Sequence, residues 1–497
     1  MPTQLTTRAQ VNGYRFLLDR YEHALVRRDI RMLHDPMRTQ FRSLVIGAVL
    51  GVLVVAGAAI LAFLRPQGSI GDAKIVMGKQ SGALYVIVDG TLHPVLNLAS
   101  ARLIVADPAS PTPVGEAKLT MPRGPLLGIP GAPAALPGSA DAGHSTWTLC
   151  DTVQGSPAAT TGVLTTAVVG SPGTGGVAGA RPMGAGDAFL ATHAGHTYLL
   201  FAGRRAELDP GDPVLIRSLG LRTATARPIG AALLDTAEPV PALQAPHIDD
   251  VGTPGPGKLS GIPVGAVVRV HRVDTDELYV VLTDGVQRVS PFAAEVIRNA
   301  NSQNMTDVTT VPPDRIVGIA VVNRLPVDKF PGPVPRIVPA DTDPVGCVSW
   351  SRSADDPAGT LTLLAGRRVP VPGDGRPVRL ATADGAGDRV DEVYVRPGTG
   401  EYVQSVGAPP GSIDRGPLFY LADNGIRYGI PDRATAAALG LAKDPKPAPA
   451  PILEALTPGP TLARPDALTS HDSLPQCPNP ADHPGACAKP IPAPAEH

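Results

Sequence analysis

The chain has 497 residues, 43% of them hydrophobic, with 43 Lys and Arg against 45 Asp and Glu and a formal net charge of −2. This near-neutral balance argues against a nucleic-acid partner. The 54 Gly and 56 Pro stay below the level of wholesale disorder, and with only 4% aromatic residues any core must be built from Val, Leu, Ile and Ala.

A single apolar segment near the N-terminus is the first strong feature of the chain. Residues 44–64 carry no charge and are bracketed by Arg42 and Arg65. At about 1.5 Å per helical residue, this run is long enough to cross the hydrocarbon core of a bilayer. A cleaved signal peptide is the alternative, but its apolar region is shorter, about 7–15 residues, and follows a short leader. The sequence therefore predicts an uncleaved transmembrane helix over residues 44–64.

The residues on the two sides of this helix differ in charge and in cysteine content. Residues 1–43 hold eight Arg against four Asp and Glu, so the positive-inside rule places this arm in the cytoplasm. All four Cys follow the helix, on the side where an oxidising compartment would pair them. We therefore expect a short cytoplasmic helical arm, a single transmembrane helix and a large body outside the cytoplasm.

The arm has apolar and basic residues at helical spacing. Two interpretations are open, a basic helix on anionic lipid and a docking surface for a cytoplasmic partner, and both can hold together. Because the long transmembrane helix already anchors the chain, the apolar positions favour the partner. The predicted partner-binding residues are Phe16, Leu17, Arg20, Leu25, Arg27, Arg28 and Met32.

Four segments of the body share one layout: an apolar strand led by Tyr, a turn on Gly, a second strand and a capped helix. Asp-Gly or Asn-Gly stands at the turn in three of them, which predicts type I′ hairpins. Four unrelated hairpins in a β-rich protein are the alternative, but the shared order favours repeats. The α+β body spans residues 65–442, with repeats expected near residues 75–104, 190–221, 265–300 and 390–442.

The helix of each repeat has recognisable ends. A helix should begin at Asn97, and Asp212 and Ser290 are N-cap types that are each followed by Pro. Gly220 and Gly440 are expected to end helices, because Gly adopts the left-handed conformation found after the last helical turn.

Two segments between the repeats mirror each other around Cys and Trp. Cys150 stands three residues after Trp147, and Cys347 stands three residues before Trp350. We predict a central module, near residues 144–170 and 340–372, that is closed by a Cys150–Cys347 disulfide with the Trp side chains packed beside it. Four Cys permit three pairings, and the sequence alone leaves the others open.

The remaining segments are rich in Pro, Gly, Ala and Ser. Residues 107–145 and 170–187 are expected to be linkers, and residues 443–497 a Pro/Ala-rich extended tail with little packing of its own. The last two Cys would close a small loop in this tail, and they are Cys477 and Cys487.

One stretch is similar to a nucleotide-binding loop. Gly252, Gly257 and Lys258 have the P-loop spacing, but Leu259 stands where a Ser or Thr should bind Mg²⁺. Pro254 and Pro256 remove N–H groups that such a loop needs, which favours a flexible linker.

Further candidate chemistry is sparse. The pair His193 and His196 suggests no third metal ligand, so a loop ahead of a strand is favoured. We therefore expect no metal, no cofactor and a scaffold rather than an enzyme.

Three motifs of the arm are specific. They are the stretches 10–16 (QVNGYRF), 23–29 (HALVRRD) and 32–38 (MLHDPMR). Together they resemble the N-terminal signature of the EccB family, a core membrane component of mycobacterial ESX (type VII) secretion systems. The resemblance extends over the whole chain, from the arm and single span to the four repeats and paired Cys.

The resemblance implies a structural subunit whose periplasmic body oligomerises and shapes an export path. It implies assembly with EccC, EccD and EccE in a hexameric inner-membrane complex, with the mycosin protease on the periplasmic side. An ATPase activity is attributed to the family, although the P-loop-like stretch here lacks an intact motif. Its repeats are also similar to a cell-wall-binding phage module. An ATPase component and a peptidoglycan-binding membrane anchor are therefore the alternatives.

Overall fold

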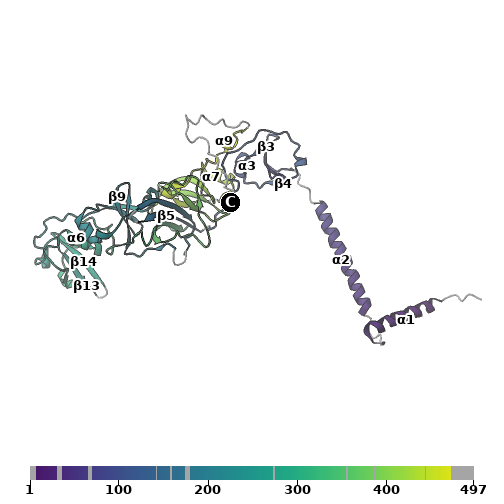
Figure 1. Cartoon of the computed structure of the whole chain (residues 1–497), viewed down its shortest axis with the longest axis horizontal. Coiled ribbons are helices and arrows are strands. Elements are labelled where there is room, and N and C mark those ends of the chain that lie inside the picture. Colours follow the sequence, from purple (N-terminus) through teal and green to yellow (C-terminus); the bar gives the residue numbers. More distant parts are fainter. Residues whose placement is uncertain are drawn as a thin grey trace, which may run out of the picture. The chain divides into compact units, whose positions relative to one another are not determined.

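The computed structural model describes residues 7–28, 30, 36–64, 70–141, 143–156, 159–173, 179–272, 275–353, 356–385, 387–412, 414–442 and 444–471. The chain divides into two compact units, residues 1–71 and 72–497. The first contains two helices, α1 (Arg8–Arg27) and α2 (Pro36–Leu64), and the second contains every strand of the described chain (Figure 1).

Helix α2 contains the predicted transmembrane segment. The stretch Phe41–Leu61 has a mean hydropathy of 2.8, and none of it is buried inside the protein. A helix that is apolar all round and uncovered by protein needs an apolar solvent, which a bilayer supplies. The helix begins at Pro36, several residues before the uncharged run, and Pro suits the first turn because its missing N–H has no helical acceptor.

The first sheet of the body has four strands around one helix. Its order is β3-β2-β1-β4, in which β1, β2 and β3 are antiparallel and β4 is parallel to β1. Helix α3 connects β3 to β4. The elements are β1 (Ile75–Gly78), β2 (Leu84–Val88), β3 (Thr91–Val95), α3 (Leu98–Val105) and β4 (Thr112–Val114), followed by the short 3-10 helix η1 (Glu116–Lys118).

The other three predicted repeat segments form sheets with the same path, three antiparallel strands, a helix and a fourth strand parallel to the first. The second is β8 (Asp187–His193), β9 (His196–Phe201), β10 (Arg204–Leu208), α4 (Pro213–Leu219), η3 (Leu221–Thr223) and β11 (Arg227–Pro228), extended by α5 (Ala231–Thr236), β12 (Glu238–Leu243) and β17 (Arg336–Ile337). The third is β13 (Val267–His271), β14 (Asp276–Leu282), β15 (Gly285–Val289), α6 (Pro291–Ala300) and β16 (Thr309–Val311), flanked by η4 (Gly257–Leu259) and η5 (Pro313–Arg315). The fourth is β22 (Gly400–Val406), β23 (Arg415–Ala422), β24 (Arg427–Ile430), α7 (Arg433–Ala438) and β25 (Lys446–Pro449).

The predicted helix ends are confirmed. The side chains of Asn97, Asp212 and Ser290 each accept a hydrogen bond from a backbone N–H in the first turn that follows. Gly220 and Gly440 have φ of 64° and 77°, the left-handed conformation expected after a helix.

The turn types were predicted less well. The Asp89–Gly90 turn has positive φ at both positions, as a type I′ turn requires. In the third sheet, however, Leu282 pairs with Gly285, so the turn consists of Thr283 and Asp284, and neither has positive φ. The type I′ prediction is wrong there because Gly285 is the first residue of β15, so Asp284–Gly285 is not the centre of the turn.

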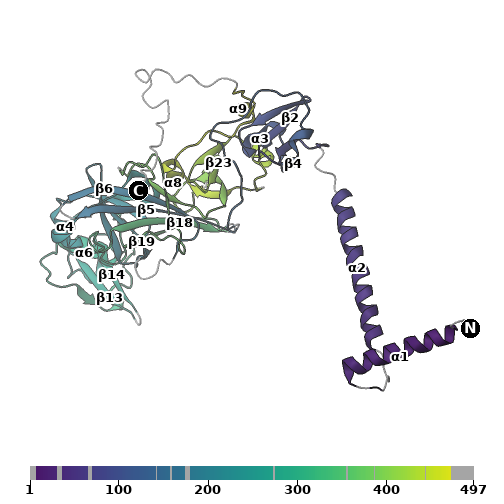
Figure 2. The same ribbon diagram turned by 45° about the vertical axis from the view of Figure 1, so that its right-hand side comes forward.

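The central module is a seven-stranded mixed sheet, called the central sheet below. Its strand order is β20-β21-β6-β5-β18-β19-β7 (Figure 2). Its four long strands come from the two segments expected to form the central module. The strands are β5 (His144–Ser156), β6 (Ala159–Val169), β7 (Arg181–Pro182), β18 (Val345–Ser353), β19 (Thr360–Gly366), β20 (Val378–Arg379) and β21 (Glu392–Tyr394).

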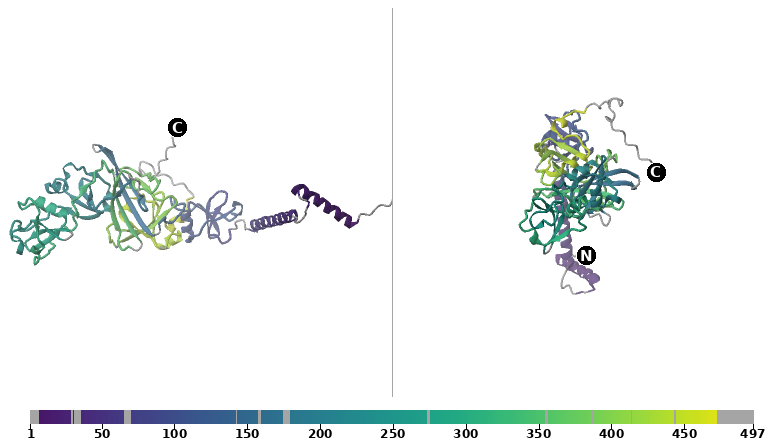
Figure 3. Two further views of the ribbon diagram at one scale, coloured as in Figure 1. Left: turned by 90° about the horizontal axis from the view of Figure 1, so that it is seen from below. Right: turned by 90° about the vertical axis from the view of Figure 1, so that its left-hand side faces the viewer.

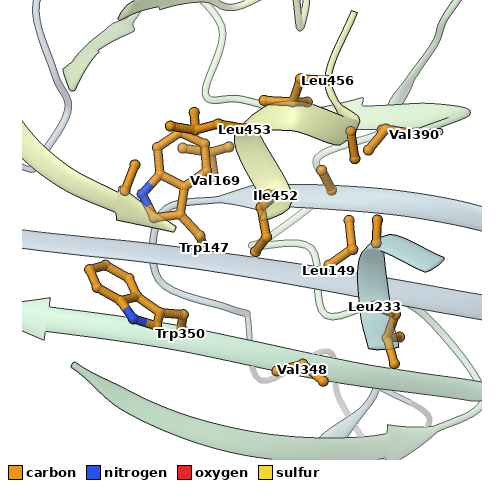
Figure 4. Packing of buried hydrophobic residues seen from close by; sticks show 14 of the residues in the cluster. Trp147, Leu149, Val169, Leu233, Val348, Trp350, Val390, Ile452, Leu453 and Leu456 are labelled. Carbon is orange, nitrogen blue, oxygen red and sulfur yellow. The ribbon is translucent and has the colours of Figure 1, made fainter. Parts of the chain in front are cut away.

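Each of the three large hydrophobic cores joins more than one sheet or helix. One core combines the first and fourth sheets, with Ile75 and Val86 beside Tyr420 and Tyr428. A second combines the second and third sheets with α4 and α6. A third packs the central sheet against α5 and α8 (Ala450–Ala455) (Figure 4). Figure 3 shows these packed sheets of the second unit in two further views.

Two expectations about unstructured segments were wrong. The expected tail contributes β25, α8 and α9 (Arg464–Ala467) to the body, and Ile452 and Leu462 are completely buried. The expected linker 107–145 contributes β4 and supplies Leu127 and Ile129 to the first core. Pro- and Ala-rich composition did not prevent packing, because these segments lie on apolar surfaces that the sheets leave open.

Candidate functional site

The predicted disulfide is present at the centre of the body. Cys150 on β5 pairs with Cys347 on β18, and the same register places Trp147 opposite Trp350. Both sulfurs are inaccessible to solvent, since each Cys has 0% exposed surface. This bond closes a loop across a sequence separation of 197 residues and fixes the register of two central strands.

The sequence predicts Trp side chains packed beside the disulfide, and this prediction is wrong. They lie with Leu149 and Val348 on one face of the sheet, where Figure 4 shows the two indoles on neighbouring strands. The disulfide lies in a separate cluster with Val345 and Leu364. The reason is the alternation of a β-strand, in which residues three apart point to opposite faces.

The second predicted Cys pair, Cys477 and Cys487, lies outside the described residues, as does Met32 of the arm.

The P-loop-like stretch is a tightly closed loop. Several of its backbone N–H groups are already used, because Gly252 donates to the carbonyl of Val264 at 3.0 Å and Gly255 donates to that of Ile262 at 2.9 Å. The Lys258 ammonium donates to the carbonyl of Asp314 at 3.1 Å.

This loop also packs against the third sheet. Leu259 is completely buried against the third sheet, so the stretch is not the flexible linker that we expected. A phosphate-binding loop must present converging free N–H groups, and here two positions are Pro and others are bonded internally. The residues therefore do not fit a nucleotide phosphate.

His193 and His196 are the two residues that flank a hairpin turn in the second sheet. The Nδ1 atom of His193 lies 3.0 Å from the carbonyl of Ile229, and that of His196 lies 2.7 Å from a carboxylate oxygen of Glu207. Among the described residues, no group of three or more His, Cys, Asp and Glu is arranged to hold a metal ion.

The arm helix α1 presents an apolar stripe that is not covered by the described chain. Five residues spaced alternately three and four apart form it, and all are between 42% and 84% exposed; they are Val11, Tyr14, Leu18, Tyr21 and Leu25. This spacing keeps the side chains on one face of a helix. The helix is closed at its start by Gln10, whose side chain accepts from the backbone N–H of Thr7 at 2.9 Å.

The predicted arm residues fall into two groups on this helix. Leu25 belongs to the stripe and Leu17 borders it, whereas Phe16 is about 160° away from Leu18 around the helix axis. Arg20 is exposed on α1 as well. Arg27 is the last residue of α1 and Arg28 its left-handed C-cap. Sequence reasoning missed Val11, Tyr14, Leu18 and Tyr21, although their three- and four-residue spacing was a readable signal.

Comparison with known proteins places these features in a family. The family description "Type VII secretion system ESX-1, transport TM domain B" matches residues 3–476. The chain is 38% identical over 487 residues to the "ESX-3 secretion system ATPase EccB3" of Mycolicibacterium smegmatis, which covers 96% of this chain and 92% of that protein.

Two solved structures are similar as well. A chain from the periplasmic assembly of the ESX-5 inner membrane complex is 34% identical, with a TM-score of 0.68, covering 83% of this chain and 100% of that one. A chain of the EccB3 dimer from the ESX-3 core complex is 36% identical, with a TM-score of 0.69, covering 80% and 100%. The chain therefore belongs to the EccB family of type VII secretion membrane components.

Proposed function

We propose that this chain is the EccB subunit of an ESX inner-membrane complex, with α2 as its anchor, α1 in the cytoplasm and the body in the periplasm. The observation that carries the proposal is a membrane-length helix between a basic amphipathic helix and a disulfide-closed body. Basic residues are retained on the cytoplasmic side of a membrane, which supports the orientation of the arm. A disulfide persists in an oxidising compartment, which supports the location of the body.

The role of the body in this proposal is structural. The four sheets are repeats of one unit around the disulfide-bridged central sheet, and the body oligomerises to shape an export path. Shared cores support such a role, because sheets joined in one core hold their geometry as a block. The solved EccB3 dimer of a relative supports self-association, here within a hexameric complex.

The arm supplies the cytoplasmic contact. We expect its stripe of Val11, Tyr14, Leu18, Tyr21 and Leu25 to pack on the EccC-type motor component, because an exposed apolar helix face gains stability only against a partner or lipid. EccD and EccE would complete the membrane complex, and the mycosin protease would bind on the periplasmic side.

The stripe and the opposite face of α1 provide a matched test. We expect Leu18→Glu with Leu25→Glu to leave the protein inserted but to remove the EccC-type component from complexes purified in detergent. The control is Phe16→Glu, a substitution of another exposed apolar residue on the far side of the same helix. Equal loss in both variants, or retention in both, would overturn the docking role and leave α1 as a lipid-binding segment.

The name of the M. smegmatis relative includes the word ATPase, so a catalytic role needs its own test. Since the amides around Gly252 and Gly255 are bonded internally, Lys258→Ala should leave both nucleotide hydrolysis and export by the complex unchanged. Loss of export with normal assembly would favour an ATPase. Sedimentation of the purified protein with cell wall would in turn reveal a peptidoglycan-binding anchor.

A further inference from the structure

Two buried carboxylates lie next to each other in the body. Asp151 on β5 and Asp391 just before β21 are 2% and 1% exposed. Thr165 on β6 joins them, because its hydroxyl donates to Asp151 Oδ1 at 2.8 Å and its backbone N–H donates to Asp391 Oδ2 at 2.9 Å. Two acids that share one hydrogen-bonding residue in the interior repel each other when both are ionised.

The pair lies where the second sheet meets the central sheet. Asp151 Oδ2 accepts a hydrogen bond of 2.6 Å from the N–H of Gly230, the N-cap residue of α5. Gly230 also packs directly on the chain around Gly387, since a Cβ added to Gly230 would lie 2.0 Å from the carbonyl oxygen of Gly387. One carboxylate therefore holds the start of α5 against the central sheet.

A buried cation, the guanidinium of Arg227, faces the pair from the second sheet. Arg227 on β11 is 2% exposed, stacks on the ring of Phe189 at 4.1 Å and donates to the carbonyl of Asp343 at 2.9 Å. Its Nε and Nη1 atoms are buried without a hydrogen-bond partner in the described part of the chain. Nη1 lies over Gly346, the cross-strand neighbour of Asp151, where a Cβ would come within 2.6 Å.

The charges around Asp151 are therefore few and identifiable. Asp391 opposes its ionisation and Arg227 favours it, and Asp343 is a second acid near Arg227. Asp391 accepts three backbone N–H bonds, from Thr165, Asp384 and Gly385, whereas Asp151 accepts one N–H and one hydroxyl. Since N–H donors support the charged form of a carboxyl, Asp151 has the weaker support.

The pKa of Asp151 agrees with this geometry. Burial is the main cause that raises it from 3.8 to about 6, against the lowering effect of the Gly230 and Thr165 hydrogen bonds. Burial also lowers the pKa of Arg227 to about 10, so its guanidinium stays charged at neutral pH.

We propose that Asp151, Thr165, Asp391 and Arg227 form a pH-sensitive contact between α5 of the second sheet and the central sheet. This contact is called the joint below. The joint is tighter when Asp151 carries a proton, because a neutral carboxyl avoids the cost of burying a charge and, to a smaller extent, the repulsion from Asp391. The folded protein holds this proton more strongly than an opened joint does. The stabilisation is therefore fully present below pH 3.8 and is lost as the pH rises through about 6.

Hydrogen exchange of the full chain in detergent tests the joint. After correction for the intrinsic rates, opening at residues 229–236 should increase about tenfold between pH 5 and pH 7.5, since the opened state regains an ordinary carboxyl pKa. Asp151→Asn should abolish this slope. The control Asp235→Asn, an exposed carboxylate on the same helix, should retain it.

A wild-type profile that is flat or of opposite sign would overturn the proposal, whether or not the Asn variant folds. A slope that persists in folded Asp151→Asn would overturn it as well. Thr165→Val offers a second variant, because removing the hydroxyl donor weakens support for the charged form and should move the midpoint to higher pH.

Discussion

Removal of the central disulfide should destabilise the module around β5 and β18 by a calculable amount. The double substitution Cys150→Ala with Cys347→Ala frees a loop that spans a sequence separation of 197 residues. In the chain-entropy treatment, closing a loop of this length is worth about 5 kcal/mol at 25 °C. The pairing of β5 with β18 remains in the variant, so the strands should still form while their unfolding becomes easier.

The two Trp residues allow the unfolding of this module to be followed separately by fluorescence. Trp147 and Trp350 are the only Trp in the chain, they are 1% exposed, and they lie opposite each other on these two strands. Their fluorescence therefore reports the unfolding of this region. For a slope on the order of 4 kcal/mol/M in guanidinium chloride, a loss of about 5 kcal/mol moves the midpoint down by about 1 M.

A neighbouring cross-strand pair on the same two strands serves as the control. The hydroxyls of Thr148 and Ser349 are 2.9 Å apart, and Thr148→Val with Ser349→Val removes one hydrogen bond without changing any loop. This control should cost about 1 kcal/mol. If the Cys variant shifts the fluorescence midpoint no more than the control does, the entropic reasoning is wrong and the strand ladder alone holds the module.

Two further substitutions test packing within the body. Gly203→Ala should destabilise by about 1–3 kcal/mol more than Gly195→Ala in chemical unfolding. Both glycines have positive φ in turns of the same sheet, but only at Gly203 would a Cβ meet Leu361, at 2.6 Å. Lys446→Met should cost about 3–5 kcal/mol, because Glu401, 2.6 Å from the ammonium and only 7% exposed, keeps the Ser139 hydroxyl but is left buried without its counter-ion. Adding Glu401→Gln should recover part of that loss.

The features that sequence predicted well depend on neighbouring residues. Helix caps such as Asp212 and Ser290 act within one turn, so residue type and spacing were sufficient. The apolar run of α2 was also readable, because its length and lack of charge are direct properties of the sequence. The Trp–Cys mirror predicted the Cys150–Cys347 disulfide, which the structure confirms.

What could not be predicted depends on contacts over long distances. The fourth strand of each repeat sheet is short, only two residues in the case of Arg227–Pro228. It has no local signal, since it forms only beside the first strand of its sheet. Likewise, Leu462 is buried in a core that includes residues hundreds of positions earlier, so composition alone suggested an extended tail. The same limit applies to Asp151 and Arg227, which are 76 residues apart and ordinary in sequence.

The pairing of the sheets explains why the end of the body packs rather than trails away. A unit of one short-stranded sheet and one covering helix is close to the size below which a domain rarely buries enough apolar surface to be stable alone. The second and third sheets are consecutive and can combine as soon as both exist. The first sheet instead takes its core from the fourth and from Leu462 and Ala467, so it lacks that core until almost the whole body is present. The central disulfide links the two halves of the chain that contribute to these cores. It joins β5, the strand that follows the first sheet, to β18, which comes after the third sheet, and thereby limits the distance between the first half of the body and the later segments that complete its core.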